Sequence, residues 1–566
     1  MRVYKSRTFI FKKKIAIMKI SLPARLILAA FLAALIIPAT LPAQIDDTFA
    51  DYLEKRMKAE RVPSYSIALI GSDGSVSSHN FGFSDTGRQS PASEHTLYEI
   101  GSVTKTFTGL LLLIQLEKHG FDLDTPVSVL SNGKINLPSG DGTEITLRHL
   151  VTHTSGLPRL PANLAPVSMN DPYVDYTYEE LYDFLKNYTP DVAPGERFEY
   201  SNLAYMVLGH LAEVLGGADY DTLVKEYITG DLQMESTRRL VTDSTRFATP
   251  TMSGLAVSTW NMDHLRGLGE LRSTSSDMAR YIKAYLQHVP FPYQSALATA
   301  YKPLYVRRQD VHLGHAWFIN TAHADTIVHH GGGTGGFRSF VAFSPVSRKG
   351  VVVLTNSNDD VEDIGLHLLN TEYELNELPD VVAVDEAALN RLTGYYTAES
   401  MPGFRIFSEG GALFGQMDGQ QALPLAAVND TLFSNAMVQA EIRFPAAGDE
   451  AAFMTLHQMG NTIRFDRSED GPAERVEMKL TADQLKAYTG TFHSELGLSF
   501  TFTVSGDQLN AQLTNQPAFP VYADGADSFF YKVVPAELKF RRSEDGKVDA
   551  VTLRQGGQQI LFLKEN

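Results

Sequence analysis

A serine and a lysine stand three residues apart in Ser102-Val-Thr-Lys105, a spacing that suits nucleophilic catalysis on a helix. The apolar residues that follow at helical spacing predict a helix that begins near Ser102, so the hydroxyl and the amine would share one face. The hydroxyl would lie at the positive end of the helix dipole, which favours an alkoxide. The amine would stabilise that alkoxide or, if buried and neutral, accept its proton. An N-cap serine beside a surface lysine produces the same pattern. The motif therefore indicates a nucleophile only together with further catalytic residues elsewhere in the chain.

A tyrosine and an asparagine form a second candidate in Tyr200-Ser-Asn202, just after a Pro-Gly turn. Tyrosine has a reference pKa near 10, but close to a lysine it could be held as a phenolate and accept the serine proton. The amide of Asn202 can bind a substrate carbonyl and the lysine. A buried tyrosine beside a turn asparagine is the alternative interpretation.

A glycine-rich segment, His330-Gly-Gly-Gly333-Thr-Gly, lies between two strand-like runs. Glycines there let another backbone or a ligand approach closely, and a strand N–H can serve as an oxyanion donor. A phosphate loop would end in Lys-Ser or Lys-Thr before a helix, and this segment does not. Metal binding is not favoured, because His329 and His330 would face opposite ways on a strand. The alternative is a flexible turn.

Together these segments resemble the serine β-lactamase and penicillin-binding-protein family, most closely its class C β-lactamase-related branch of D-aminopeptidases and family VIII esterases. Ser102-Val-Thr-Lys105 matches the SxxK motif, and Tyr200-Ser-Asn202 matches YxN. His330-Gly-Gly332 stands where many members have Lys-Thr-Gly. The order of the motifs and their wide separations also fit, over residues 48–375.

The resemblance implies that Ser102 is the acylated nucleophile and that Lys105 and Tyr200 share the proton transfers, with either as the base. It also implies that the N–H groups of Ser102 and Gly333 form the oxyanion hole. The substrate-binding positions that it assigns are Asn202, His330, Gly332 and Gly333. No metal or organic cofactor is implied. His149 and His153 have the i, i+4 spacing of a metal pair but lack the glutamate of a zinc protease.

The departure from the family pattern is His330 in place of a lysine. A neutral imidazole attracts a substrate carboxylate less than an ammonium does, which puts efficient β-lactamase activity in doubt. We therefore expect a serine hydrolase, with a peptidase on D-amino-acid peptides first, then a carboxylesterase, then a weak β-lactamase. The non-enzymatic alternative is a catalytically silent protein that binds peptide or peptidoglycan. The expected partner is a small-molecule or peptide substrate, and the oligomeric state is left open.

The elements that must position these groups follow from the hydrophobic pattern. Strands are predicted at both ends of the first domain, with helices between them, including one over 106–118. The predicted strands cover 64–70, 76–83, 313–320, 325–330, 337–344 and 350–355, and a last helix covers 361–375. This order predicts an α/β (α+β) domain over 44–378, an antiparallel sheet flanked by helices in which the first and last segments adjoin.

The remaining chain contains a repeat. Residues 389–396 resemble residues 485–492 at an offset of 96, and two further blocks keep an offset of 96 or 97. Residues 383–470 and 478–566 are therefore two copies of one unit. Short alternating runs between turn residues predict a small all-β barrel or sandwich for each. D-aminopeptidases of the resembled family carry two C-terminal β-barrels, one of which restricts the entrance to the active site.

The composition of residues 1–43 predicts an export signal. Residues 26–37 are twelve unbroken apolar residues, too few to span about 30 Å of hydrocarbon, and they follow basic residues. A cleaved signal peptide is predicted over 1–43, with Met18 as an alternative start, and the expected product is periplasmic or secreted with no stable membrane anchor. The whole chain of 566 residues carries a net charge of −17, to which residues 1–43 contribute +8, leaving −25 for the rest. A segment this acidic does not favour binding to nucleic acid. The absence of cysteine excludes disulfides and thiol nucleophiles.

Overall fold

The computed structural model describes most of the chain after the predicted signal segment, which lies outside the described residues. The residues described are 44–131, 135, 137, 142–164, 166, 171–241, 243–378, 382, 384–399, 401–418, 420, 422–435, 438–446, 450–458, 460–469, 477–494, 497–514, 518–531, 536–543, 545–555 and 558–565. None of the helices within these ranges is both long and apolar enough to cross a bilayer.

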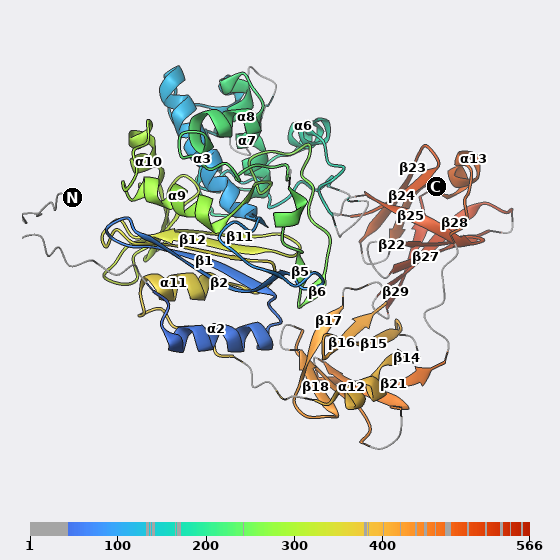
Figure 1. Ribbon diagram of the computed structural model, residues 1–566. Coiled ribbons are helices and arrows are strands. Elements are labelled where there is room, and N and C mark those ends of the chain that lie inside the picture. The colour runs from blue at the N-terminus through green and yellow to red at the C-terminus, as the bar shows by residue number, and fades with distance from the viewer. Residues whose placement is uncertain are drawn as a thin grey trace, which may run out of the picture. The chain divides into compact units, whose positions relative to one another are not determined.

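A nine-stranded antiparallel sheet forms the centre of the first domain, in the order β3-β2-β1-β13-β12-β11-β10-β9-β8 (Figure 1). Its strands are β1 (Ser64–Ile70), β2 (Val76–Asp85), β3 (Ser90–Pro91), β8 (Tyr305–Arg308), β9 (Val311–Leu313), β10 (Phe318–Asn320), β11 (Ile327–Gly333), β12 (Arg338–Phe343) and β13 (Gly350–Thr355). Strand β1 pairs with β13, with Tyr65 opposite Thr355. The first and last segments of the domain therefore adjoin, as the sequence predicts.

Helices cover both faces of this sheet (Figure 1). The helices of the domain are α2 (Asp47–Ala59), α3 (Thr104–His119), α4 (Val127–Leu130), α5 (Leu147–Val151), α6 (Tyr178–Asn187), α7 (Asn202–Gly216), α8 (Tyr220–Val224), α9 (Ser275–Tyr285), α10 (Gln294–Ala300) and α11 (Glu362–Leu369). On one face, Leu53 of α2 and Ile364 of α11 pack with Ile67 and Phe340 in a single apolar cluster. On the other face, α9 packs against β1, β12 and β13, and α3 packs against α7. The predicted α/β class is confirmed.

The sheet contains two short strands that the sequence does not predict, β3 and β8, and it differs from the prediction within one predicted strand. The run predicted as a single strand over 313–320 is a hairpin of β9 and β10, closed by a hydrogen bond from Gly314 N to Trp317 O of 2.8 Å. The turn includes Ala316 at a φ of 70°, a left-handed conformation that an alanine adopts only under tertiary constraint. The last predicted helix is also shorter and ends at Leu369.

The C-terminal part of the chain forms two closed eight-stranded barrels, as the repeat and the resemblance predict. The first barrel contains β14 (Gly394–Thr397), β15 (Phe404–Glu409), β16 (Ala412–Met417), β17 (Leu423–Ala427), β18 (Leu432–Asn435), β19 (Ala440–Arg443), β20 (Phe453–Gln458) and β21 (Asn461–Ser468). The second contains β22 (Gly490–Ser494), β23 (Ser499–Ser505), β24 (Gln508–Leu513), β25 (Ala518–Gly525), β26 (Ser528–Tyr531), β27 (Ala536–Arg542), β28 (Val548–Gln555) and β29 (Gln558–Lys564). A short helix precedes each barrel, α12 (Glu386–Leu392) and α13 (Ala482–Leu485). The first strands begin at equivalent repeat positions, Gly394 and Gly490.

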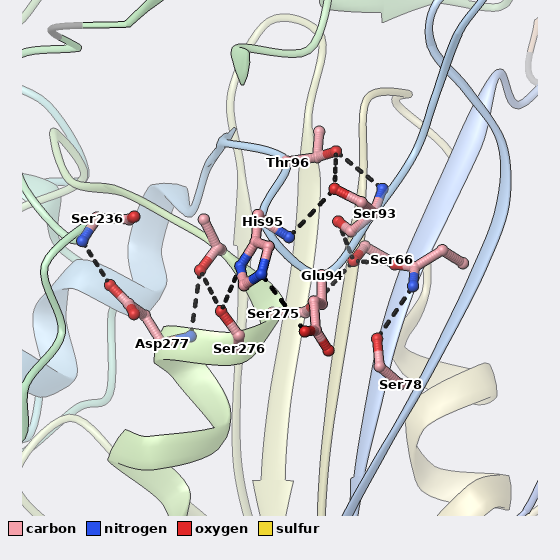
Figure 2. A network of polar contacts seen from close by, with 12 residues as sticks. Ser66, Ser78, Ser93, Glu94, His95, Thr96, Ser236, Ser275, Ser276 and Asp277 are labelled. Atoms are coloured by element: carbon pink, nitrogen blue, oxygen red, sulfur yellow. Dashed lines mark hydrogen bonds and ion pairs between the residues drawn. The ribbon is translucent and has the colours of Figure 1, made fainter.

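A polar network at the start of α9 holds the segment that leads to the predicted nucleophile (Figure 2). The hydroxyl of Ser66 on β1 lies 2.7 Å from that of Ser275 and donates to the carbonyl of Ser93 at 3.2 Å. Downstream of Ser93, β4 (Tyr98–Glu99) pairs with β7 (Arg272–Ser273), which leads directly into α9. The chain before residue 102 is therefore fixed against both the sheet and α9.

Candidate active site

Ser102 lies on a single 3-10 turn, η1 (Gly101–Val103), directly before α3, rather than on the helix itself. Its neighbours in the turn are buried while Ser102 is partly exposed. Gly101 adopts a φ of 48°, and a Cβ at that position would lie 2.7 Å from the backbone nitrogen of Gly333. Glycine is therefore required for η1 to approach the end of β11 so closely. This approach brings together the two segments whose N–H groups are predicted to bind an oxyanion.

Lys105 is fully buried in the first turn of α3, with its amine against Ser102. Lys105 Nζ lies 3.0 Å from Ser102 Oγ and donates a hydrogen bond to the carbonyl of Leu268 at 2.6 Å. Burial lowers the pKa of Lys105 to about 7, although the negative charge of Glu270 acts to raise it. A large fraction of this amine is therefore neutral near pH 7 and able to accept the Ser102 proton.

Glu270 is a buried carboxylate that the sequence analysis missed. It accepts hydrogen bonds from the backbone N–H groups of Gly267 at 2.7 Å and Gly269 at 3.0 Å. These bonds fold the loop on itself and hold the Leu268 carbonyl where it meets Lys105. Burial raises the pKa of Glu270, and the backbone donors oppose that rise. An acid directly after two closely spaced glycines is the local signal that could have identified it.

Tyr200 shares a hydrogen bond with Ser102, and its ring centroid lies 5.3 Å from Lys105 Nζ. Burial raises the pKa of Tyr200 to about 12, against the lowering effects of the bond to Ser102 and of the Arg159 charge. The sequence alone also allows a phenolate held by a nearby lysine. The structure favours a neutral phenol instead, because burial outweighs the nearby positive charge. Lys105 is therefore the better base of the two at neutral pH.

Asn202 begins α7, immediately after the Ser201 N-cap, whose hydroxyl accepts the backbone N–H of Ala204 at 2.9 Å. This cap fixes where the helix starts and so the direction in which Asn202 leaves it. The Asn202 backbone N–H donates to the carbonyl of Arg159 at 3.0 Å. Its side-chain oxygen is buried and has no hydrogen-bond partner among the described residues. That oxygen is available to accept a hydrogen bond from a substrate N–H.

His330 lies on β11 and is 1% exposed. Its Nδ1 lies 2.6 Å from the carbonyl oxygen of Gly331, so Nδ1 carries the hydrogen and Nε2 holds a lone pair. Nε2 is buried and, within the described part of the chain, unpartnered. Burial, assisted by the charge of Lys105, lowers the pKa of His330 to about 3. The imidazole is therefore neutral, and the group that replaces the family's lysine is a hydrogen-bond acceptor.

Gly332 allows β11 to press against the segment before Ser102, and Gly333 leaves room for the side chain of Arg338. A Cβ on Gly332 would lie 2.1 Å from the carbonyl oxygen of Ile100, and one on Gly333 would lie 2.5 Å from Nη1 of Arg338. Ser339 on the paired strand β12 also donates to the Ile100 carbonyl at 2.7 Å. Any side chain at 332 would separate β11 from η1.

His153 is a second buried residue of the site. The sequence pattern suggests only a metal pair with His149, not this position beside Tyr200. Its ring stacks on Tyr200 with centroids 4.3 Å apart, and its Nδ1 accepts the Ser201 N–H at 3.0 Å. Burial, with the charge of Lys105, holds the pKa of His153 well below its usual range. His149 instead accepts the Thr146 N–H at 3.1 Å. Across the ranges that the structure describes, no three histidine or acidic side chains could hold a metal ion together.

The comparisons with known proteins identify the family of the chain. The family described as "Beta-lactamase" matches residues 49–372, and a family described as "Domain of unknown function (DUF3471)" matches residues 474–564. Penicillin-binding protein 4* of Bacillus subtilis is 25% identical over 419 residues, which cover 68% of this chain and 90% of that protein. Protein flp of Staphylococcus aureus is 26% identical over 335 residues, which cover 56% of this chain and 65% of that protein.

A solved structure with a similar fold is also a penicillin-binding protein homologue. An octameric penicillin-binding protein homologue from Pyrococcus abyssi aligns with a TM-score of 0.51 and 23% identity, covering 74% of this chain and 98% of that one. The family match covers more than half of the chain and includes every residue of the predicted site. The chain therefore belongs to the beta-lactamase family of serine hydrolases, among penicillin-binding-protein-like neighbours.

Proposed function

We propose that this protein is an exported serine hydrolase that forms an acyl-enzyme at Ser102 on amide or ester substrates, with D-amino-acid peptides as its main substrates. One observation carries the hydrolase assignment. Lys105 Nζ lies 3.0 Å from Ser102 Oγ, and its pKa of about 7 leaves much of it neutral at physiological pH. A buried neutral amine against a partly exposed hydroxyl is the arrangement that a serine nucleophile requires.

In the proposed reaction, Lys105 accepts the Ser102 proton while Oγ attacks the substrate carbonyl carbon. The N–H groups of Ser102 and Gly333 would donate to the oxygen that becomes negative. Tyr200 then gives its phenolic proton to the leaving nitrogen or oxygen and receives one from the Lys105 ammonium. The bond to the leaving group breaks, and the acyl ester on Ser102 remains. Water hydrolyses that ester by the reverse proton path, which releases the acid and restores Ser102.

The preference for peptides rests on the acceptors in the site. His330 Nε2 and Asn202 Oδ1 are both buried and have no partner within the described ranges. Two bare acceptors suit the N–H groups of a peptide, whereas a simple ester offers none. Leaving such acceptors unpaired costs about 1–3 kcal/mol each, so a substrate that lacks the N–H groups is disfavoured. A carboxylesterase is the second candidate, and a weak β-lactamase, which the family match supports, is the third.

Covalent labelling tests the nucleophile. Purified mature protein is treated with a fluorophosphonate and with a fluorescent penicillin, alongside Ser102→Ala and a control, Ser128→Ala. We expect the label on the wild type and on the control, and none on Ser102→Ala. Hydrolysis should fall by about 10⁶-fold in that variant. Equal labelling of Ser102→Ala would overturn the assignment, and a wild type that takes neither label would favour the catalytically silent binding protein.

A substrate panel ranks the activities. We expect D-alanine p-nitroanilide to have a higher kcat/KM than p-nitrophenyl butyrate relative to their uncatalysed rates, and nitrocefin to be the poorest substrate. The reverse order would make the protein an esterase or a β-lactamase. Export is tested separately by mass spectrometry of the protein from the producing cells, where a first peptide that begins near Gln44 supports cleavage of the predicted signal.

A further inference from the structure

An exposed arginine stands beside the catalytic tyrosine. The guanidinium carbon of Arg159 lies 5.4 Å from the centre of the Tyr200 ring. The arginine is exposed, and no carboxylate in the described part of the chain forms an ion pair with it. Its carbonyl oxygen accepts the N–H groups of Asn202 at 3.0 Å and Leu203 at 3.3 Å, so its backbone is fixed to the start of α7. Its guanidinium thus presents donors from an anchored position, and no described residue is recorded as accepting from them.

The charge of Arg159 reaches into the site. It lowers the pKa of four groups that surround Ser102, namely Lys105, His153, Tyr173 and Tyr200. These inner groups carry little positive charge of their own near pH 7, because burial keeps both histidines neutral and Lys105 partly so. The guanidinium of Arg159 thus supplies positive charge at the edge of a site whose inner groups carry little.

The group on β11 cannot bind a substrate carboxylate. His330 presents the lone pair of Nε2, and a carboxylate oxygen placed there would meet another acceptor with no proton between them. An anionic substrate needs its partner elsewhere. A guanidinium matches a carboxylate with two parallel hydrogen bonds, and such charge-assisted pairs are stronger than neutral ones.

We propose that Arg159 binds a substrate carboxylate and so determines a preference for acidic substrates over their neutral counterparts. This proposal rests on the proposed function, because it concerns the same site. Arg159 would act as a specificity-determining residue on the α7 side of the site, while β11 would bind N–H groups. The preferred substrate is thus a peptide that offers both N–H donors and a free carboxylate.

A second exposed arginine provides a matched control. Arg307 on β8 also lies over an aromatic ring, with its guanidinium carbon 4.6 Å from the centre of Phe198. It is not among the groups that perturb the pKa of Lys105. Arg307→Gln therefore removes the same charge from the same kind of setting without changing the field at the catalytic amine.

The test compares matched substrates that differ by one carboxylate. One pair is N-acetyl-D-alanyl-D-alanine and its C-terminal amide, which places the charge on the leaving group. The other pair is succinyl- and acetyl-D-alanine p-nitroanilide, which places it on the acyl side. We expect the wild type and Arg307→Gln to prefer the charged member of at least one pair by about tenfold in kcat/KM. Arg159→Gln should remove that preference, and Arg159→Lys should keep part of it.

The ratio within a pair separates specificity from folding, since structural damage lowers the rates of both members together. The same pairs are also titrated calorimetrically into Ser102→Ala, with and without Arg159→Gln, which requires no turnover. An inactive wild type that still binds the charged member through Arg159 would refute the proposed function and support this inference. The inference is overturned if neither pair shows a preference for the charged member in either assay, or if the preference survives Arg159→Gln.

Discussion

The hydrolase domain and the two barrels bury different kinds of side chain. The second barrel fills its interior with aromatic rings such as Phe502 and Phe540, whose centroids lie 5.0 Å apart. Apart from tyrosines, Asn435, at 8% exposed, is the one buried polar side chain among the described barrel residues. The hydrolase domain buries ionisable groups as well, including Lys105 and Glu270, at a cost in stability. The proposed chemistry therefore resides where burial is energetically unfavourable, and the barrels follow the ordinary rules of a stable core.

Replacing Lys105 with methionine should produce the largest difference between the effect on activity and the effect on stability. Lys105→Met removes the proposed base and fills the space with an apolar chain of similar length, so acylation should fall on the order of 10²–10⁴-fold. Stability should hold or increase, because a buried amine no longer loses its hydration. Labelling kinetics and thermal unfolding of wild type and variant measure the two effects.

The pH dependence of that stability difference provides an internal check. The pKa of Lys105 is lower in the folded state than its ordinary value of 10.5, at about 7, so the unfolded chain binds more protons between these values. Wild-type stability should therefore rise relative to Lys105→Met as pH increases from about 7 to about 10. A difference that stays constant over this window would show that the amine is not neutral in the folded protein.

A cavity in a barrel should affect stability without affecting chemistry. Phe540 contacts the rings of Tyr488, Phe492, Phe502 and Phe529, and is 4% exposed. Phe540→Ala should destabilise the second barrel by about 3–5 kcal/mol. Urea unfolding followed by circular dichroism measures the loss.

The matched control on the same barrel is Leu561→Ala, since Leu561 is 48% exposed and should cost less than about 0.5 kcal/mol. At a temperature where Phe540→Ala remains folded, both variants should hydrolyse a small ester at the wild-type rate. A large loss of ester hydrolysis in folded Phe540→Ala would show that the barrel contributes to the chemistry, and the contrast between the two regions would fail.

The same contrast explains what the sequence could and could not predict. Buried elements leave continuous or periodic apolar runs, so the strands 64–70 and 350–355, the helix that begins just after Ser102, and the two barrels follow from the printed sequence. The hairpin within 313–320 does not, because its turn depends on a left-handed Ala316 that no local residue preference indicates.

The electrostatics of the site were also beyond local sequence reasoning. Glu270 and His153 act through contacts with Leu268, Tyr200 and Ser201 that only the folded chain creates. The phenol of Tyr200 stays neutral because of burial, and burial is a property of the whole domain rather than of the YxN motif. Motifs therefore identify which residues meet, and the surrounding core sets their protonation.

The smallest expected effect concerns the field that sets the protonation of Lys105. Glu270 raises its pKa and Arg159 lowers it, while His153 and His330 are neutral across this range. Because acylation needs the neutral amine, kcat/KM should rise with pH through about 7 in the wild type. Arg159→Gln removes a positive charge, so the pKa of Lys105 should increase. The rising limb of the profile of kcat/KM against pH should therefore move to higher pH by about 0.3–1 unit.

The shift is measured with p-nitrophenyl butyrate, a neutral substrate that makes no use of a carboxylate-binding group. Arg307→Gln should leave the limb where it is, and high salt should move the wild-type limb toward that of Arg159→Gln, because salt screens an exposed charge. A limb that moves to lower pH, or moves equally in both variants, would place Arg159 outside the field of the catalytic amine. The charge of Arg159 at the surface would then have no influence on the pKa of the buried groups. The buried site would be electrostatically more separate from the rest of the molecule than we propose.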